Sequence, residues 1–258
     1  MRTCAVSLVV LLALLPAAQA HAASEDGWDM VHKVRSRIEG RNCGGAVALL
    51  KDGLKAGYPE VALLAGSMYE QGICVKPDWD NAVTFYIQAY QGGLPVAAER
   101  LAAGCADPAN GPDVAAALWW GLRERGATRY ASCAVSAAAQ QDPDRFVAEL
   151  NSWDRGKQAL CNYMVGVIST ISGEVKYPRR AQILGRDGEV VLRFLPAVPR
   201  IELGEGAEGD TLPDKAVARA GFETTLREAA DRALRRYPQP PGIPASTEAS
   251  VRYVFELR

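Results

Sequence analysis

The cysteines are the most reactive side chains of this chain. There are six among 258 residues, and five lie well inside the chain, at Cys43, Cys74, Cys105, Cys133 and Cys161. None are spaced as Cys-x-x-Cys, which argues against a thioredoxin-like redox centre and against a zinc site. In an exported protein, such widely spaced cysteines indicate disulfide bonds. Because the number is odd, one thiol is left over.

We predict two disulfide bonds, Cys43–Cys74 and Cys133–Cys161, and a free thiol at Cys105. In an antiparallel helical hairpin, the start of one helix lies beside the end of the next, and Cys43 and Cys74 occupy two such ends. Cys133 and Cys161 fall within segments that can stack side by side as helices. The alternative bond Cys105–Cys133 stays open. Each bond should stabilise the fold by roughly 2–4 kcal/mol.

Residues suited to catalysis are scarce. The only histidines are His21 and His32, so a Ser-His-Asp or Cys-His arrangement in the folded body has no base. The carboxylates are scattered along the chain. The stretch 204–209 alternates Gly with Glu and Ala; it lacks the Lys-Ser/Thr of a phosphate-binding loop, and its charge would repel phosphate. We therefore predict no enzymatic activity, no cofactor, no metal and no small-molecule substrate.

The first 23 residues resemble a secretory signal peptide. An apolar stretch runs from Val6 to Leu15, and a small-x-small cleavage motif follows at residues 18–20. The mature chain would then begin near His21 or Ala23 and reside in the periplasm. The alternative is an uncleaved anchor in the inner membrane, since residues 3–23 are just long enough to span a bilayer.

The net charge of the whole chain is −1. Positive and negative residues are mixed in both halves, so the chain lacks the basic face that a nucleic-acid partner requires. We expect protein partners instead, with envelope or outer-membrane proteins among the candidates. Homodimer formation is an alternative.

Residues 24–172 read as a series of short helices separated by glycine. Gly57 and Gly93 each precede a helix that carries alanine at the same offset, Ala62 and Ala98. A spacing of about 36 residues is typical of a helical-hairpin solenoid. The expected helices are 28–39, 46–56, 59–71, 78–92, 95–103, 113–125 and 150–171, with another beginning at 142–143 and a small apolar segment at 129–140.

The stretch from Ala46 to Gly93 resembles Sel1-like repeats, which are relatives of the tetratricopeptide repeat. The matching residues are Ala62, Ala65, Met68, Tyr69, Gly72, Asp78, Ala82, Tyr86, Ala89 and Gly92. The following repeat departs from the pattern, with Cys105 and Pro108 at the positions of Tyr69 and Gly72. The resemblance implies an adaptor or scaffold role.

The composition changes in residues 173–258. Alternating apolar residues predict strands at 188–194, 200–203 and 250–257. Two helical segments, 212–220 and 222–237, stand between the second and third strands. The predicted order is β-β-α-β, so we expect an α+β protein with a helical solenoid followed by a small second domain.

This second segment resembles the C-terminal domain of TonB-family energy transducers. The matching residues are Tyr177, Pro178, Ala181, Gly185, Gly188, Val190, Leu192, Phe194, Leu212, Ala216, Ala220, Pro238 and the last strand. Gly209-Asp210 stands where the family has Ser-Gly. The resemblance implies that the edge of the last strand pairs with a receptor segment.

Two functions follow from these patterns. The first is a periplasmic adaptor that carries a TonB-like module on a helical platform. The second is an energy transducer for transport, anchored by its N-terminus and coupled to outer-membrane receptors. Transducers of that family usually have a long proline-rich spacer, which is missing here between residues 23 and 177. We therefore favour the adaptor.

The predicted partner-binding site is the last strand, because little sequence is left to cover its outer edge. We expect Arg252 and Glu256 on the solvent face, and Val251, Tyr253, Phe255 and Leu257 against the apolar stripe of the preceding helix. The alternative is that Arg232–Tyr237 or a dimer mate shields this edge. The predicted site residues are Val251, Arg252, Tyr253, Val254, Phe255 and Glu256.

Overall fold

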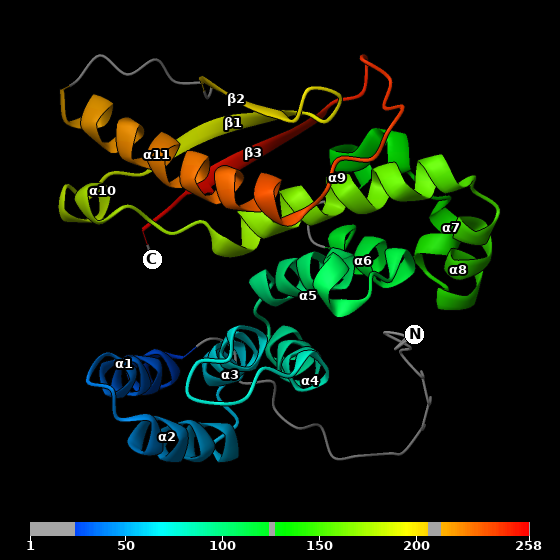
Figure 1. The fold of residues 1–258 in the computed structure, drawn as a ribbon. Helices are drawn as coiled ribbons and strands as arrows, with labels where there is room; N and C mark the ends of the chain where they lie inside the picture. Colours follow the sequence, from blue (N-terminus) through cyan, green and yellow to red (C-terminus); the bar gives the residue numbers. More distant parts are fainter. Residues whose placement is uncertain (1–23, 124–126, 206–212, 258) are drawn as a thin grey trace.

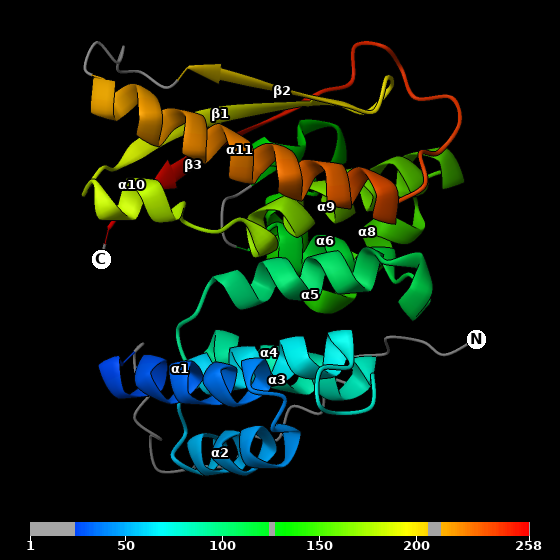
Figure 2. The same cartoon turned by 60° about the vertical axis from the view of Figure 1, so that its left-hand side comes forward.

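A computed structural model describes residues 24–123, 127–205 and 213–257. The predicted signal peptide, residues 1–23, lies outside these ranges. The described residues are mostly helical and carry one three-stranded antiparallel sheet, so the predicted α+β class is confirmed. In Figures 1 and 2, the first four helices form one end of the molecule, and the sheet lies at the other end with the long helix α11 running along it.

The first half of the chain forms helices that pack in consecutive pairs, α1 with α2, α3 with α4, and α5 with α6. The bounds of α3 and α4 agree with the prediction to within one residue, whereas α1 and α2 begin three residues earlier than predicted, α5 ends three residues later and α6 ends four residues earlier. The Asp78 carboxylate accepts a hydrogen bond from the Asn81 amide at the start of α4, and Gly72 ends α3 with a left-handed φ of 69°. The bounds are α1 Glu25–Glu39, α2 Cys43–Lys55, α3 Pro59–Gln71, α4 Trp79–Gln91, α5 Val96–Ala106 and α6 Val114–Gly121.

The middle of the chain is less regular than the sequence suggests. The small apolar segment 129–140 does not form one helix; it is divided between a 3₁₀ segment and a helix of four residues. Neighbouring tryptophans of α6 contact different rings, Trp119 against Phe146 and Trp120 against Tyr90. The bounds are η1 Pro108–Asn110, η2 Ala127–Cys133, α7 Ala137–Gln140, α8 Pro143–Asn151 and α9 Arg155–Glu174.

The C-terminal part has the predicted order of strands and helix, with two corrections. The segments 212–220 and 222–237 are one continuous helix, and a short helix that the sequence did not reveal precedes the first strand. Gly221 does not break the long helix; there a Cβ would lie 3.1 Å from Pro178 Cβ. The bounds are α10 Arg179–Ile183, β1 Gly188–Leu195, β2 Arg200–Glu205, α11 Pro213–Arg236 and β3 Ala249–Phe255.

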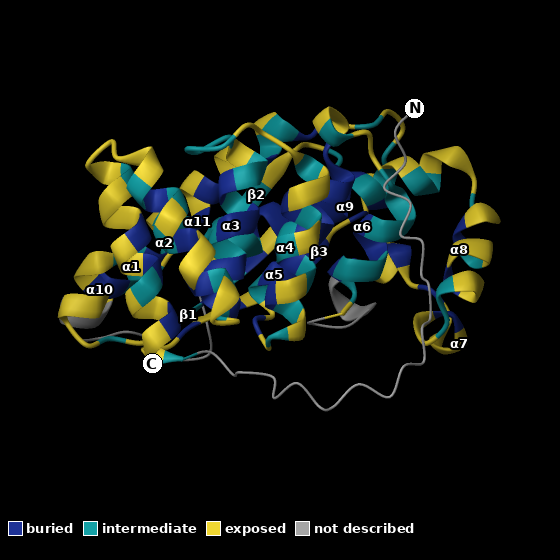
Figure 3. Cartoon of the chain, turned by 90° about the horizontal axis from the view of Figure 1, so that it is seen from below, coloured by how far each residue is buried: buried dark blue, intermediate teal, exposed yellow. Residues whose placement is uncertain are grey.

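Helix α9 joins the two halves of the molecule. It packs against α5 and α6 on one side and α11 on the other. Its Tyr163 ring meets Phe194 of β1, and its Ser172 hydroxyl bonds to the Tyr253 hydroxyl of β3. Exposed residues dominate α8 and α10, at opposite ends of the view in Figure 3. Among the helices described, none has the length and hydropathy that a membrane span needs.

Candidate functional site

Strand β3, which the sequence predicts as the partner-binding site, lies at one edge of the sheet. The strand order is β2-β1-β3, and β3 pairs with β1 alone, from Gly188 opposite Phe255 to Phe194 opposite Ala249. Its side chains alternate strictly between the two faces. Val251, Tyr253 and Phe255 are buried, whereas Arg252 and Val254 point to solvent.

The charged end of α11 does not shield this edge. Arg232 and Arg236 are turned toward the helical half of the molecule, where both pair with Glu174. Instead, η2 packs against β3. This cover from an earlier segment could not be predicted from the sequence.

The residues after β3 correct one expectation. Glu256 is exposed, as expected, but Leu257 lies beyond the end of β3 and is 38% exposed, unlike the buried Val251, Tyr253 and Phe255. The Leu257 amide donates a hydrogen bond to the Asp187 carboxylate at 2.7 Å. This bond ties the end of the chain to the loop that enters β1. The alternation of β3 therefore stops at Phe255.

A groove of about 880 Å³ lies between the helical half and the C-terminal part. One wall is formed by α1 and α3, with Trp28, Leu64 and Met68 among its apolar side chains. The other side is formed by the end of α9, residues 175–176 and α11, including Lys176 and Arg232. Clefts between structural units are common binding sites.

A single segment separates this groove from β3. Residues Gly173 to Lys176 line the groove, while the residues that flank them contact the strand. Ser172 bonds to Tyr253, as described above, and the Tyr177 ring lies 6.0 Å from the Phe255 ring, edge to face. Residues 172–177 therefore lie between the groove and the buried face of β3.

Two arginines of neighbouring helices anchor a buried charge network beneath the groove. Arg100 of α5 lies 3.6 Å from the Glu174 carboxylate of α9 and 4.0 Å from that of Glu70 in α3. Arg236 of α11 lies 2.5 Å from Asp107 and 3.1 Å from Glu70. Four helices thus meet through charge-assisted contacts.

Burial shifts the protonation equilibria of this network. It would by itself lower the pKa of Arg100, but Tyr86, Glu70 and Glu174 outweigh it and the pKa is raised. Burial raises the pKa of Tyr86, whose hydroxyl donates to Glu70 at 2.6 Å. Arg100 and Arg236 are therefore fixed positive charges, and the network acts as structural support.

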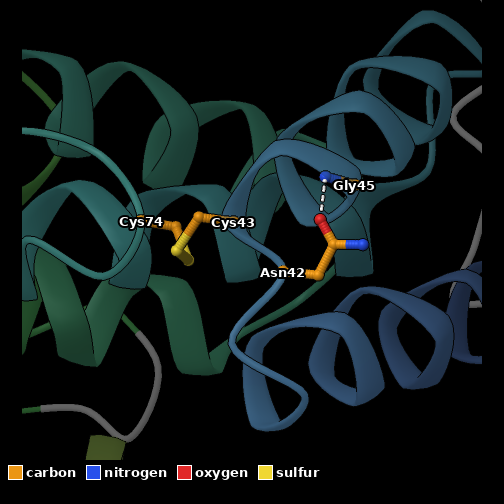
Figure 4. The surroundings of a disulfide bond; sticks show 4 residues. All are labelled: Asn42, Cys43, Gly45 and Cys74. Atoms are coloured by element: carbon orange, nitrogen blue, oxygen red, sulfur yellow. Dashed lines mark hydrogen bonds between the residues drawn. A yellow bond between two sulfur atoms is a disulfide. The ribbon is translucent and has the colours of Figure 1, made fainter.

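Both predicted disulfides are present. Cys43 and Cys74 have Cα atoms 5.0 Å apart, and Cys133 and Cys161 have Cα atoms 5.6 Å apart. Cys105 is a buried free thiol. Figure 4 shows the first bond at the start of α2, where the Asn42 side chain accepts a hydrogen bond from the Gly45 amide. Disulfides fit an oxidising, exported environment.

Neither the groove nor the charge network could be predicted from the sequence. Glu70, Arg100 and Arg236 occupy ordinary positions on amphipathic helices, and only the packing of distant helices brings them together. Within residues 24–123, 127–205 and 213–257, no group of three His, Cys, Asp or Glu side chains could hold a metal ion.

Comparisons of this chain with protein-family models, with curated proteins and with solved structures find no match.

Proposed function

We propose that this protein is a non-enzymatic adaptor of the periplasm, which binds an extended segment of a partner protein along β3. The observation that carries the proposal is the place of β3 at the end of the sheet order β2-β1-β3. An edge strand offers unpaired N–H and C=O groups to an incoming strand. Arg252 and Val254 lie on the solvent face of this strand.

The support beneath the strand suits an adaptor. A partner strand gains affinity from main-chain hydrogen bonds only if the receiving strand is held rigidly. Three aromatic rings, Tyr177, Phe222 and Phe255, pack against one another beneath the end of β3. The helical half, joined through α9, would present a second surface to another protein.

The solvent face of the sheet sets the side-chain preference of the partner. Val254 is 53% exposed, and Arg252 pairs with Glu189 across the strand at 3.2 Å. A neighbouring strand would place its own side chains beside these two. We expect a β-branched residue next to Val254, because such pairs stabilise a sheet.

The test uses peptides selected from a displayed random library against the full mature chain. Val254→Pro removes one backbone donor from β3, which abolishes strand pairing with the peptide if that donor faces outward, and Val254→Ala is the matched control that keeps the donor. We expect fluorescence anisotropy to show retained binding by the Ala variant and loss of binding by a folded Pro variant.

A second measurement is independent of the folding of any variant. Methylating alternate backbone nitrogens of the selected peptide removes its donors without changing its side chains. In strand pairing, methylation in one of the two alternating registers abolishes binding and methylation in the other is tolerated. Equal binding by both methylated peptides, or a library that yields no binder, would contradict the proposal.

A further inference from the structure

The two disulfides differ sharply in their access to solvent. Cys133 and Cys161 are both 0% exposed and belong to the main hydrophobic core. Cys43 is exposed and Cys74 is half-buried at the surface. Because thiol–disulfide exchange requires a thiolate to reach a sulfur atom, only the Cys43–Cys74 bond can react while the protein stays folded.

The position of Cys43 favours cleavage of this bond. Cys43 is the first residue of α2, a helix of 13 residues, directly after its cap Asn42. The positive end of a helix dipole stabilises a thiolate and lowers the pKa of a thiol placed there. Cys43 is therefore the better leaving group of the two, since exchange is faster when the departing thiol has a low pKa.

Because Cys43 is the better leaving group, the sulfur of Cys74 is the one that is attacked. Cys74 lies in the connection between α3 and α4 and has a left-handed φ of 59°, which is uncommon for a residue with a Cβ. Cys74 and its neighbours Ile73 and Val75 pack against the core of the first three helices. The connection is thus held by its apolar neighbours and by its bond to α2.

We propose that Cys43–Cys74 is the site of thiol–disulfide exchange in this protein, and that its reductant is a dithiol, either free or in a thioredoxin-class oxidoreductase. One thiolate of the reductant attacks Cys74 Sγ, the disulfide bond breaks, and its electron pair leaves on Cys43 Sγ. The second thiolate then attacks the mixed disulfide and releases the Cys74 thiolate. Cys43–Cys74 is reduced to two thiols, and the dithiol is oxidised to a disulfide.

Reduction acts on the helices that border the groove. Helix α2 packs mainly on α1, and less extensively on α3. Helix α1 forms part of the groove wall, through Trp28 and Val31. Without the bond, the connection 72–75 no longer tethers the start of α2. The α1–α2 pair then opens more often than the rest of the protein.

The test treats the native chain with dithiothreitol, blocks free thiols with N-ethylmaleimide at timed points, and locates the label by peptide mass mapping. We expect Cys43 and Cys74 to be labelled at least about tenfold sooner than Cys133 and Cys161. Cys105, 3% exposed, reports opening of the core. Hydrogen exchange should accelerate in α1 and α2 after reduction and stay unchanged in α9.

The leaving-group assignment has its own readout. With glutathione as a monothiol, the mixed disulfide should accumulate on Cys74. The single variants Cys74→Ser and Cys43→Ser form a matched pair, in which alkylation rates against pH should give the Cys43 thiol a lower pKa than the Cys74 thiol. Equal labelling of both disulfides, earlier labelling of Cys133–Cys161, or glutathione on Cys43 would overturn the proposal.

Discussion

Tyr237 shows how much a single side chain can join in this molecule. Its ring is buried directly after the end of α11, and its hydroxyl donates to the Ala103 carbonyl of α5 at 2.8 Å. The same oxygen lies 2.9 Å from the Thr170 hydroxyl of α9. One phenol thus satisfies two polar groups, from two helices distant in sequence. Buried polar atoms that lose such partners are costly.

Replacing Tyr237 with Phe should therefore destabilise the fold by about 1–3 kcal/mol, because the Ala103 carbonyl and the Thr170 hydroxyl lose their partner in a buried site. Tyr58→Phe is the matched control, since its hydroxyl has no hydrogen-bond partner within the described ranges. Urea unfolding followed by circular dichroism measures both changes. Equal values for the two variants would show that the Tyr237 hydroxyl contributes nothing.

The buried tyrosines also predict an alkaline limit to stability. Burial raises the pKa of both Tyr86 and Tyr237 above the ordinary value of 10.0. As pH rises past 10.0, the unfolded chain loses these protons while the folded chain keeps them. The contribution of these two tyrosines to stability is therefore constant below that pH and falls above it, by up to about 1.4 kcal/mol per pH unit for each tyrosine. In the Tyr86→Phe variant, urea midpoints should fall less steeply between pH 10 and 11 than in the unmodified chain; an unchanged slope would contradict this assignment.

At the scale of elements, α9 organises the fold through close backbone contacts. A Cβ at Gly166 would lie 2.6 Å from the Tyr237 ring. This ring, directly after the end of α11, therefore packs on the α9 backbone. Near the exposed start of the same helix, a Cβ at Gly156 would meet only the Asp154 carboxylate. Gly166 is therefore needed for close packing against Tyr237, whereas Gly156 has no comparable packing role.

Substituting Gly166 and Gly156 with alanine, one at a time, tests whether only the first is required for close packing. Gly166→Ala should cost about 1–3 kcal/mol, because the ring of Tyr237 or the helix must shift. Gly156→Ala should leave stability unchanged or raise it by up to about 1 kcal/mol, since alanine restricts the unfolded chain. Thermal unfolding measures both. A cost at Gly166 no larger than at Gly156 would mean that α11 can move away from α9 freely.

The elements that the sequence predicts well are those with explicit end signals. Helix α3 begins at Pro59, α4 begins directly after its cap Asp78, both are followed by glycine, and the three strands alternate clearly. The prediction was wrong where local signals and packing disagree. Gly221 suggested a break in a helix that continues, and the helix predicted at 150–171 starts only at Arg155, because residues 150–151 belong to α8. At the candidate site, the edge strand and both disulfides could be predicted. The cover by η2 and the groove could not, because they arise from contacts between distant segments.

At the scale of the whole molecule, the charge network joins the helical half to the C-terminal part. Arg100 and Arg236 bring together carboxylates from α3, from α9 and from the end of α5. The Arg100 and Glu70 side chains are only 11% and 9% exposed. Such buried ions are costly unless each has its partner, so they fix one arrangement of the two parts. The described residues should unfold as one cooperative unit.

Arg100→Met tests this coupling, because it removes the most deeply buried cation of the network and leaves Glu70 to Arg236, and Glu174 to Arg232 and Arg236. Because two cations of the network remain, we expect a loss of about 1–3 kcal/mol. Arg193→Met is the matched control; Arg193 also contacts two carboxylates, Glu248 at 2.5 Å and Glu202 at 3.3 Å, but its side chain is 50% exposed. Exposed pairs contribute at most about 1 kcal/mol, so this variant should have a urea midpoint close to that of the unmodified chain.

Urea unfolding monitored separately by tryptophan fluorescence and far-ultraviolet circular dichroism should give coincident transitions for the unmodified chain. In Arg100→Met both transitions should move to lower urea together. If they separate, or if Arg100→Met costs no more than Arg193→Met, the two parts are held together by the apolar packing of α9 and not by the charge network.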